Sequence, residues 1–518
     1  MSWKEEVEGI EARRRRAREM GGPDALARQH ARGRLSVRER IDRLVDPESF
    51  FEQGPLAGHG EVDEAGRLRE FQPANYVLGL ARVKGRPCAV GGEDFTQRGG
   101  SPTPAGLRKS VYAEALALRH RVPLVRFLEG AGGSVAAGGD RGARPAGEPV
   151  YATPRFRSVM QLLATAPVAS AALGAVAGLP AARLAASHFA VMTRKTAQVL
   201  IGGPALVERA LGVSMSKEEL GGAEVHARSG VVDNLADDEQ DAFDQMRRFL
   251  GYLPTNVDQL PPVVACDDPP ERREEELLSL VPRERRKIYA ARRLVRAVVD
   301  RDSFFELTRG FGRSQVTGLA RLAGHPVGVW ANDPRFYAGS MTAEGARKVR
   351  RFVDLCDTFH LPIVAFVDEP GFMIGPQAER EATIRFGAET LAAVQQASVP
   401  WASVIVRKAY GVAAAAHFGP EAFVIAWPSA ESGALPVEGG VAVAFRREIE
   451  AAPDPERRRA ELEEALAAGR SPFPRAEAFS VHDLVDPRAT REILCRWLEW
   501  SWPLLERQLG PRRYTYRP

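Results

Sequence analysis

The chain contains a long internal duplication, and this repeat limits the folds that it can adopt. Asp46 aligns with Asp300 at an offset of 254 residues (300 − 46). Longer matches follow at offsets of 239 (324 − 85) or 233 (399 − 166): GRP (85–87) with GHP (324–326), GLRK (106–109) with GARK (345–348), PLVRFLE (123–129) with PIVAFVD (362–368), and APVAS (166–170) with VPWAS (399–403). Offsets that stay constant within blocks and change only between them indicate two copies of one domain, because insertions gather in loops.

Both copies predict the same order of helices and strands. In each copy an apolar strand precedes a Gly-Ser turn and a helix, and a second and a third strand follow. The predicted strands cover residues 82–90, 124–128 and 168–173 in the first copy and 327–330, 363–367 and 403–406 in the second, and the predicted helices cover 105–119 and 343–359. Strands that alternate with helices are typical of an α/β protein with a largely parallel sheet.

The segment between the two copies has a different composition. Residues 253–286 are rich in proline and in charged side chains, which is typical of a linker. We therefore predict an N-terminal domain at 1–255, a linker at 256–285 and a C-terminal domain at 286–518.

Four glycine-bearing turns lie at the predicted carboxyl ends of strands, where parallel sheets place their active sites. They are residues 130–134 and 177–179 in the first copy, and 370–372 and 411–413 in the second. At 400–416 an apolar strand, a turn with Gly411 and an alanine-rich segment predict a helix whose first backbone N–H groups have no partner. Such groups stabilise a developing negative charge, on a phosphate or an oxyanion. The repeated arrangement favours a functional role over a purely structural one.

The rest of the sequence argues against several other classes of protein. A net charge of +4 is too small for a nucleic-acid-binding surface. The four cysteines form no CxxC pair and the nine histidines have no metal-binding spacing, so we expect no metal. The first residues contain no apolar signal segment and no run of 18 apolar residues occurs, so we expect a cytoplasmic protein without a membrane partner. Because no side-chain base is evident at the turns, we expect a substrate or cofactor to supply the base.

Long motifs along nearly the whole chain match those of one enzyme family. They are QHARGRLSVRERIDRLVDPESFFE (29–52), ELGGAEVHARSGVVD (219–233), VDEPGFMIGPQAE (367–379), IRFGAETLAA (384–393), VIVRKAYGVAAA (404–415) and IAWPSAE (425–431). On these motifs the chain resembles the carboxyltransferase (beta) subunits of biotin-dependent acyl-CoA carboxylases, such as those for propionyl-CoA and methylcrotonyl-CoA. The resemblance implies two tandem crotonase-like (ClpP/crotonase) domains. It also implies a ring-shaped homohexamer, a trimer of dimers, with sites between the N-domain of one subunit and the C-domain of another.

The resemblance further implies a reaction, a cofactor and partners. In this family carboxybiotin on a carrier protein releases CO2, the freed ureido nitrogen takes the α-proton of an acyl-CoA, and the resulting enolate attacks the CO2. The coenzyme A thioester is the substrate, and the expected partners are a biotin carboxylase and a biotin carboxyl carrier subunit. The chain contains no biotinyl-lysine motif of the Met-Lys-Met kind, so the carrier is expected to be a separate protein.

The family's site residues fall on defined positions of this chain. The positions that correspond to its two backbone oxyanion holes are Gly178, Leu179, Gly411, Val412 and Ala413. The positions that correspond to substrate or biotin binding are Gly132, Gly133, Gly371, Phe372 and Ala415. Which hole binds the thioester and which the biotin stays open. Ala415 occupies the position linked to acyl-chain choice, and its small side chain predicts an acyl group larger than acetyl.

Both predicted oxyanion holes depart from the family pattern. Gly178-Leu179-Pro180 and Gly411-Val412-Ala413 stand where the family usually has Gly-Gly-Ala. Leucine resists positive φ, and proline has no N–H group. Three hypotheses therefore stay open: a carboxylase carboxyltransferase, an acyl-CoA decarboxylase or transcarboxylase subunit, and a non-catalytic assembly subunit.

Overall fold

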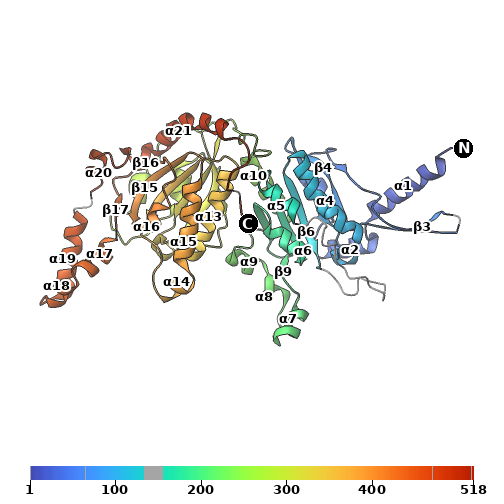
Figure 1. Cartoon of the computed structure of the whole chain (residues 1–518), viewed down its shortest axis with the longest axis horizontal. Helices are drawn as coiled ribbons and strands as arrows, with labels where there is room; N and C mark the ends of the chain where they lie inside the picture. Colours follow the sequence, from blue (N-terminus) through green and yellow to red (C-terminus); the bar gives the residue numbers. More distant parts are fainter. Residues whose placement is uncertain (1, 65, 133–155, 469–470, 515) are drawn as a thin grey trace. The chain divides into compact units, whose positions relative to one another are not determined.

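Two separate units make up the chain in the computed structural model, which describes residues 2–64, 66–132, 156–468, 471–514 and 516–518 (Figure 1). One unit covers Met1–Gln259 and the other Leu260–Arg517. This division lies at the start of the predicted linker. Each unit is built around one eight-stranded sheet, and the first also has a two-stranded sheet, β2 (Gly58–Val62) with β3 (Leu68–Pro73).

The large sheet of the first unit has the strand order β1-β4-β5-β6-β7-β8-β10, with β9 beside β7. These strands are β1 (Phe51–Glu52), β4 (Tyr76–Val83), β5 (Arg86–Glu93), β6 (Leu124–Gly130), β7 (Val168–Ala177), β8 (Phe189–Thr193), β9 (Gln198–Leu200) and β10 (Asn234–Ala236). From β5 onward the strands are parallel, as predicted, whereas β1 and β4 are antiparallel.

The sheet of the second unit repeats this order as β11-β12-β13-β14-β15-β16-β18, with β17 beside β15. Its strands are β11 (Phe305–Leu307), β12 (Gln315–Leu322), β13 (His325–Asn332), β14 (Ile363–Glu369), β15 (Trp401–Tyr410), β16 (Phe423–Ala426), β17 (Glu431–Gly433) and β18 (Asp483–Leu484). It is again antiparallel as far as β13 and parallel beyond it. The matching topology confirms the α/β class and the duplicated, crotonase-like domains.

Helices cover these sheets. Those of the first unit are α1 (Lys4–Glu19), α2 (Pro23–Ala31), α3 (Val37–Leu44), the 3-10 turn η1 (Arg98–Gly100), α4 (Pro104–His120), α5 (Arg157–Leu163), α6 (Leu179–Ala185), α7 (Pro204–Leu211), α8 (Lys217–Gly221), α9 (Ala223–Ser229) and α10 (Glu239–Tyr252). Two aromatic side chains of α10 fix this helix to the sheet. Phe243 packs edge-on against Phe127 at 5.4 Å between ring centroids, and Phe249 stacks on Phe189 at 4.9 Å.

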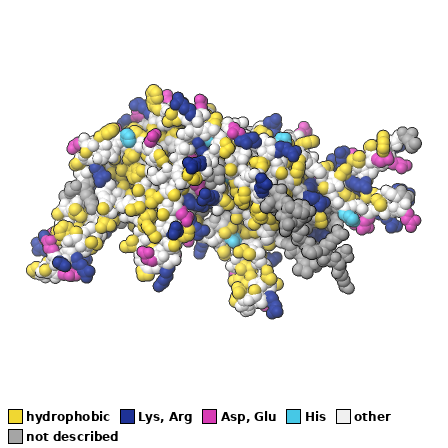
Figure 2. All heavy atoms as spheres, viewed as in Figure 1, with side chains coloured by type: hydrophobic (Ala, Val, Ile, Leu, Met, Phe, Trp, Pro, Cys, Tyr) yellow, Lys and Arg dark blue, Asp and Glu magenta, His cyan; other side chains and the backbone are white. Residues whose placement is uncertain are grey.

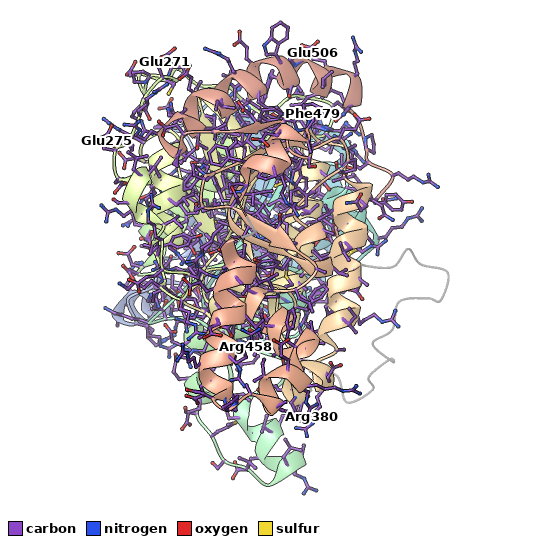
Figure 3. All side chains as sticks on the ribbon, turned by 90° about the vertical axis from the view of Figure 1, so that its left-hand side faces the viewer. Glu271, Glu275, Arg380, Arg458, Phe479 and Glu506 are labelled. Atoms are coloured by element: carbon purple, nitrogen blue, oxygen red, sulfur yellow. The ribbon has the colours of Figure 1, made fainter. Side chains whose placement is uncertain are left out.

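The second unit has a comparable set of helices and a C-terminal addition. They are α11 (Leu277–Leu280), α12 (Ala291–Val298), η3 (Tyr337–Gly339), α13 (Ala343–Thr358), α14 (Pro376–Arg380), α15 (Thr383–Gln396), α16 (Gly411–Ala415), α17 (Val437–Ala444), α18 (Arg446–Ala451), α19 (Pro455–Ala468), α20 (Phe473–Glu477), η4 (Pro487–Ala489), α21 (Thr490–Ser501) and η5 (Trp502–Gln508). Helices α17 to α19 form a small apolar core of their own around Val441 and Ile449. Arg458, which Figure 3 labels on α19, pairs with Glu448 at 2.5 Å.

Equivalent residues of the two copies make equivalent hydrogen bonds. The carboxylate of Asp46 accepts from the N–H groups of Lys84 and Gly85 at 2.8 and 2.7 Å, and that of Asp300 accepts from Ala323 and Gly324 at 2.9 and 2.8 Å. The repeated aspartate therefore holds the turn of a β-hairpin in each unit. This turn also divides the predicted strand 82–90 between β4 and β5, because Gly85 has a φ of +77°.

The surface mixes side chains of all kinds. In Figure 2 lysine and arginine are interspersed with aspartate, glutamate and apolar side chains, in keeping with the low net charge. No helix in the described part of the chain combines the length and apolar character needed to cross a membrane.

Candidate functional site

The turn after β7 brings two predicted site residues of the first unit together. Gly178 caps the N-terminus of α6 with φ 64° and ψ −125°, a conformation suited to glycine. A Cβ atom added to Gly178 would lie 3.0 Å from the Cα of Gly132, which follows the neighbouring parallel strand β6. The two turns thus meet at the carboxyl ends of adjacent strands. Gly133, which was predicted to share this site, lies outside the described residues.

Leu179 and Pro180 fit this turn without strain. Positive φ falls on Gly178 alone, since Leu179 is already the first helical residue of α6. The N–H groups of the first helical turn have no acceptor within the helix, and proline is favoured there because it has no N–H to satisfy. The N–H of Ala182 donates to the carbonyl of Gly178 at 3.1 Å. The departure from Gly-Gly-Ala therefore preserves the N–H of Leu179 at the helix start.

The turn after β15 has the same construction in the second unit. Gly411 takes a φ of +63°, and the helix α16 begins with it. Val412 and Ala413 are the second and third helical residues, so their N–H groups also lack acceptors within the helix. The strand reaches Tyr410, beyond the predicted end at 406, and the helix ends at Ala415. Val412 is 60% exposed, and Ala415 lies on the surface near the end of this helix.

The turn after β14 lies beside it. Gly371 has a φ of +130°, and its N–H donates to a carboxylate oxygen of Glu369 at 3.0 Å. Phe372 forms a bridge with Met341, and its ring lies over Gly387. Because β14 and β15 are parallel neighbours, the structure places the turns at 371–372 and 411–413 at the same edge of the sheet.

Glu369, just before the turn at 371–372, and His417, just after α16, form a buried carboxyl–imidazole pair. The sequence patterns did not indicate this pair. Glu369 and His417 are fully buried, with 3.4 Å between an oxygen of Glu369 and Nε2 of His417. The imidazole stacks on Trp330 at 3.8 Å between ring centroids. Glu369 also accepts from the N–H of Met341 at 3.2 Å and from Asn332 at 3.0 Å. Burial raises the pKa of Glu369 to about 8 and lowers the pKa of His417 to about 3.

We expect the second unit to lose stability as the pH rises from 6.5 to about 8. Burial raises the pKa of Glu369 above its usual 4.5, so the folded unit keeps a proton that the unfolded chain releases, and this contribution is lost through pH 8. His417 works in the opposite direction only below pH 6.5, where the unfolded chain takes up a proton. Urea unfolding at pH 6.5 and 8.5 should show a loss of about 2 kcal/mol. An equal loss in Glu369→Gln would contradict this origin.

Basic residues near the turns already have protein partners. Arg407 is buried and pairs with Asp368 at 2.9 Å. Lys348 is buried and donates to the carbonyls of Thr308, Phe311 and Gln315 at 2.7 to 3.1 Å. These side chains hold the backbone of the second unit. Lys109, the equivalent of Lys348, is half-buried and donates to the carbonyl of Gly54 at 3.1 Å, and burial lowers its pKa to about 8.

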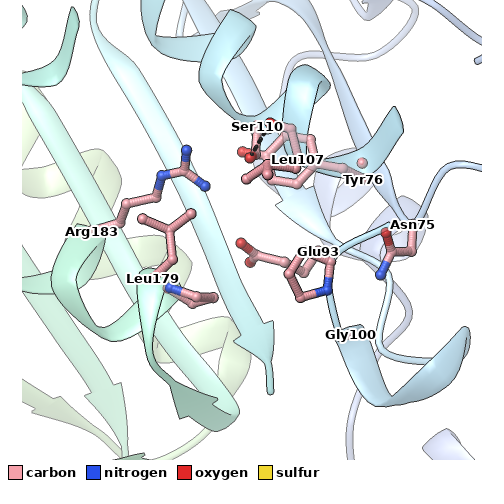
Figure 4. Close-up of a pocket in the computed structure, with 11 residues that line it drawn as sticks. Asn75, Tyr76, Glu93, Gly100, Leu107, Ser110, Leu179 and Arg183 are labelled. Atoms are coloured by element: carbon pink, nitrogen blue, oxygen red, sulfur yellow. Dashed lines mark hydrogen bonds between the residues drawn. The ribbon is translucent and has the colours of Figure 1, made fainter. Parts of the chain in front are cut away.

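A cavity adjoins the turn of Leu179 in the first unit (Figure 4). The lining residues are Asn75, Tyr76, Glu93, Gly100, Pro102, Gly106, Leu107, Ser110, Leu179, Pro180 and Arg183. Only Leu179 among them was a predicted site residue. Pro180 and Arg183 share α6 with it, and the others come from the distant segments 75–76, 93 and 100–110. The described residues contain no group of histidine, cysteine and carboxylate side chains suited to a metal ion.

Comparisons with known proteins all identify carboxyltransferases as the relatives of this chain. The family model described as the carboxyl transferase domain matches residues 28–513. The carboxyltransferase subunit of propionyl-CoA carboxylase from Haloferax mediterranei is 35% identical over 500 residues, which are 95% of each chain. The methylmalonyl-CoA carboxyltransferase 12S subunit of Propionibacterium freudenreichii is 34% identical over 92% of this chain and 91% of its own.

Solved structures give the same result for the fold. A transcarboxylase 12S crystal structure, described as a hexamer with methylmalonyl-coenzyme A and methylmalonic acid bound, aligns with a TM-score of 0.86. It is 30% identical to this chain, and the alignment covers 100% of this chain and 97% of the other.

Proposed function

The chain belongs to the carboxyl transferase family, and from this premise we propose that it transfers a carboxyl group between biotin and the α-carbon of an acyl-CoA. The observation that carries the proposal is the repeated turn. Gly178 and Gly411 both have a φ near +64°, follow equivalent strands and begin helices with free N–H groups. Two such turns provide one binding place for each of the two oxygens that gain negative charge, on the thioester and on the biotin ureido group.

The chain's own residues bind and orient the reactants. The N–H of Leu179 forms one oxyanion hole, and those of Val412 and Ala413 form the other. Biotin, when bound, supplies the carboxyl group and a basic nitrogen. Gly132, Gly371 and Phe372 line the approaches to the two turns, and Gly371 is held in place by Glu369. Losing one backbone donor of this kind typically lowers the rate by about 10²–10³.

The proposed assembly is a homohexamer that works with a biotin carboxylase and a separate biotin carrier subunit. Large apolar side chains beside the second-unit turns support a subunit interface there, since Ile374 is 81% and Val412 is 60% exposed. We also propose a cytoplasmic location, which the four unpaired cysteines support.

The second candidate function is that of a transcarboxylase subunit, and the similarity to the 12S subunit favours it. Failure of the chain to associate with a biotin carboxylase would distinguish this function from the first.

The proposal is tested by carboxyl transfer to free biotin. Purified chain is incubated with biotin and malonyl-, methylmalonyl- or ethylmalonyl-CoA, and the loss of the carboxylated thioester is measured. Because Ala415 leaves room at the site, we expect the branched substrates to exceed malonyl-CoA in kcat/KM by roughly tenfold or more. A strong preference for malonyl-CoA would refute this expectation about the acyl group. No turnover by intact hexamers would favour the non-catalytic alternative.

A further inference from the structure

The two residues of the first unit that depart from the family pattern contact the same cavity. Leu179 and Pro180 both line the cavity shown in Figure 4. Leu179 thus combines two features, a free N–H at the start of α6 and a side chain that occupies part of the adjoining space. A group bound through its oxygen at this N–H would extend directly against the leucine side chain. Glycine at position 179 would leave that space open.

The walls of the cavity are largely apolar. Tyr76, Leu107, Leu179 and Pro180 contribute carbon atoms. Two of the polar lining residues are already satisfied, since Asn75 donates to the carbonyl of Ser101 at 2.7 Å and Ser110 donates to that of Leu107 at 2.8 Å. The lining that remains is mostly apolar, and this favours a hydrocarbon group over a polar one.

One buried donor faces the cavity without a partner. The side chain of Arg183 is 4% exposed and is held to Glu114 by its Nε atom at 2.9 Å. Its Nη2 atom has no hydrogen-bond partner among the described residues. Arg183 lies four residues after Leu179, so both side chains project from one face of α6, about one helical turn apart. A buried donor in this state is costly unless a water or ligand oxygen accepts from it.

The charges around the cavity favour such an acceptor. Arg126 and Arg183 share the carboxylate of Glu114, at 3.0 and 2.9 Å. The carboxyl group of Glu93 also lines the cavity and is 6% exposed, and burial raises its pKa. Two guanidinium groups therefore share one carboxylate beside the cavity, and this favours an acceptor oxygen there.

We propose that this cavity receives the acyl group of a CoA thioester, that Leu179 limits its length, and that Arg183 binds an oxygen carried by the acyl group. The inference rests on the proposed function and assigns the thioester to the first unit. The preferred substrate class is a short acyl chain that carries a hydroxyl oxygen beyond the thioester carbonyl. The family glycine at position 179 would admit longer chains.

The test measures binding, so it does not require turnover. Isothermal titration calorimetry of the full chain without biotin compares free CoA, butyryl-CoA, hexanoyl-CoA and 3-hydroxybutyryl-CoA. We expect wild type to prefer 3-hydroxybutyryl-CoA to butyryl-CoA by about tenfold, the value of one hydrogen bond to a charged group. In Leu179→Gly the affinity ratio of hexanoyl-CoA to butyryl-CoA should rise about tenfold, because two more methylene groups become buried.

Three further variants make the result specific. Leu107→Ala enlarges the cavity from α4 without touching the turn, so it should shift the length ratio in the same direction as Leu179→Gly. Arg183→Lys keeps a cation beside Glu114 but lacks the second N–H of the guanidinium fork, so it should lose the preference for the hydroxyl. Val412→Gly changes the corresponding departure in the other unit and should leave the length ratio unchanged.

Two results would overturn the inference. One is that no acyl-CoA binds more tightly than free CoA, and the other is that folded Leu179→Gly and Leu107→Ala both keep the wild-type length ratio. If the chain transfers carboxyl groups but the variants do not shift the length ratio, the role of the cavity is refuted and the proposed function stands. If binding depends on acyl length but no carboxyl group is transferred, the proposed function is refuted and the role of the cavity stands.

Discussion

Gly178→Ala is expected to lower kcat for carboxyl transfer by roughly 10²–10³-fold while the chain still folds. Gly178 has φ 64° and ψ −125°, which an alanine adopts only with strain. The added methyl group would also lie 3.0 Å from the Cα of Gly132. One of the two turns must therefore move, and the N–H of Leu179 moves with it. Steady-state kinetics with free biotin and methylmalonyl-CoA measures the effect.

A matched control separates backbone strain from loss of the site. Gly85 lies in the hairpin between β4 and β5 with φ +77°, and a Cβ there would meet no atom within 4 Å. Gly85→Ala also places a side chain at positive φ, at a cost of about 1–2 kcal/mol, but does not touch the turns, so kcat should stay near that of wild type. If Gly178→Ala kept more than a third of the activity, this turn would have no role in the reaction.

Glu129→Ala is expected to lower the free energy of unfolding of the first unit by about 3–5 kcal/mol. The carboxylate of Glu129 is fully buried and accepts from Arg34 at 2.5 Å, from Arg40 at 2.6 Å and from Gln29 at 2.8 Å. Arg40 keeps a second carboxylate, Glu239, at 2.8 Å. Among the described residues no second carboxylate pairs with Arg34, and burial already lowers its pKa. The variant therefore leaves an uncompensated charge in the interior. Denaturant unfolding gives the value.

An exposed ion pair provides the comparison. Glu11 pairs with Arg14 at 2.8 Å on α1, where both side chains are about half exposed. Glu11→Ala should change stability by less than about 0.5 kcal/mol, since water and salt screen such pairs. A loss below 1 kcal/mol in Glu129→Ala would show that the buried pair adds no more than the exposed one.

Local patterns predicted the elements of the fold well. The duplicated strands at 124–128 and 363–367 were found because long apolar runs are specific for buried parallel strands. Strand 82–90 was wrongly predicted as one piece, because the hairpin turn between β4 and β5 takes only two residues, Lys84 and Gly85. The helix after Gly411 is shorter than its alanine content suggests. It ends at Ala415, and four residues later Gly419 lies against the ring of Trp401.

The chemistry around the turns was much harder to predict than the turns themselves. Arg183 faces a cavity whose other walls come from β4, β5 and α4, and Glu369 meets His417 across 48 residues of sequence. Such contacts depend on how the strands are ordered, which no local pattern records. The spacing of Leu179 and Arg183 on one face of α6 was the available signal, and it gains meaning only once the cavity is known.

The single strained glycine in each turn has an evolutionary consequence. Because the positive φ in each turn falls on Gly178 or Gly411, the next position keeps its N–H with any side chain except proline. Selection can then exchange glycine, leucine or valine there with little cost to folding. The side chain that contacts the substrate can therefore change while the backbone N–H that stabilises the charge stays in place. A lineage can thus change its substrate preference without altering the oxyanion hole.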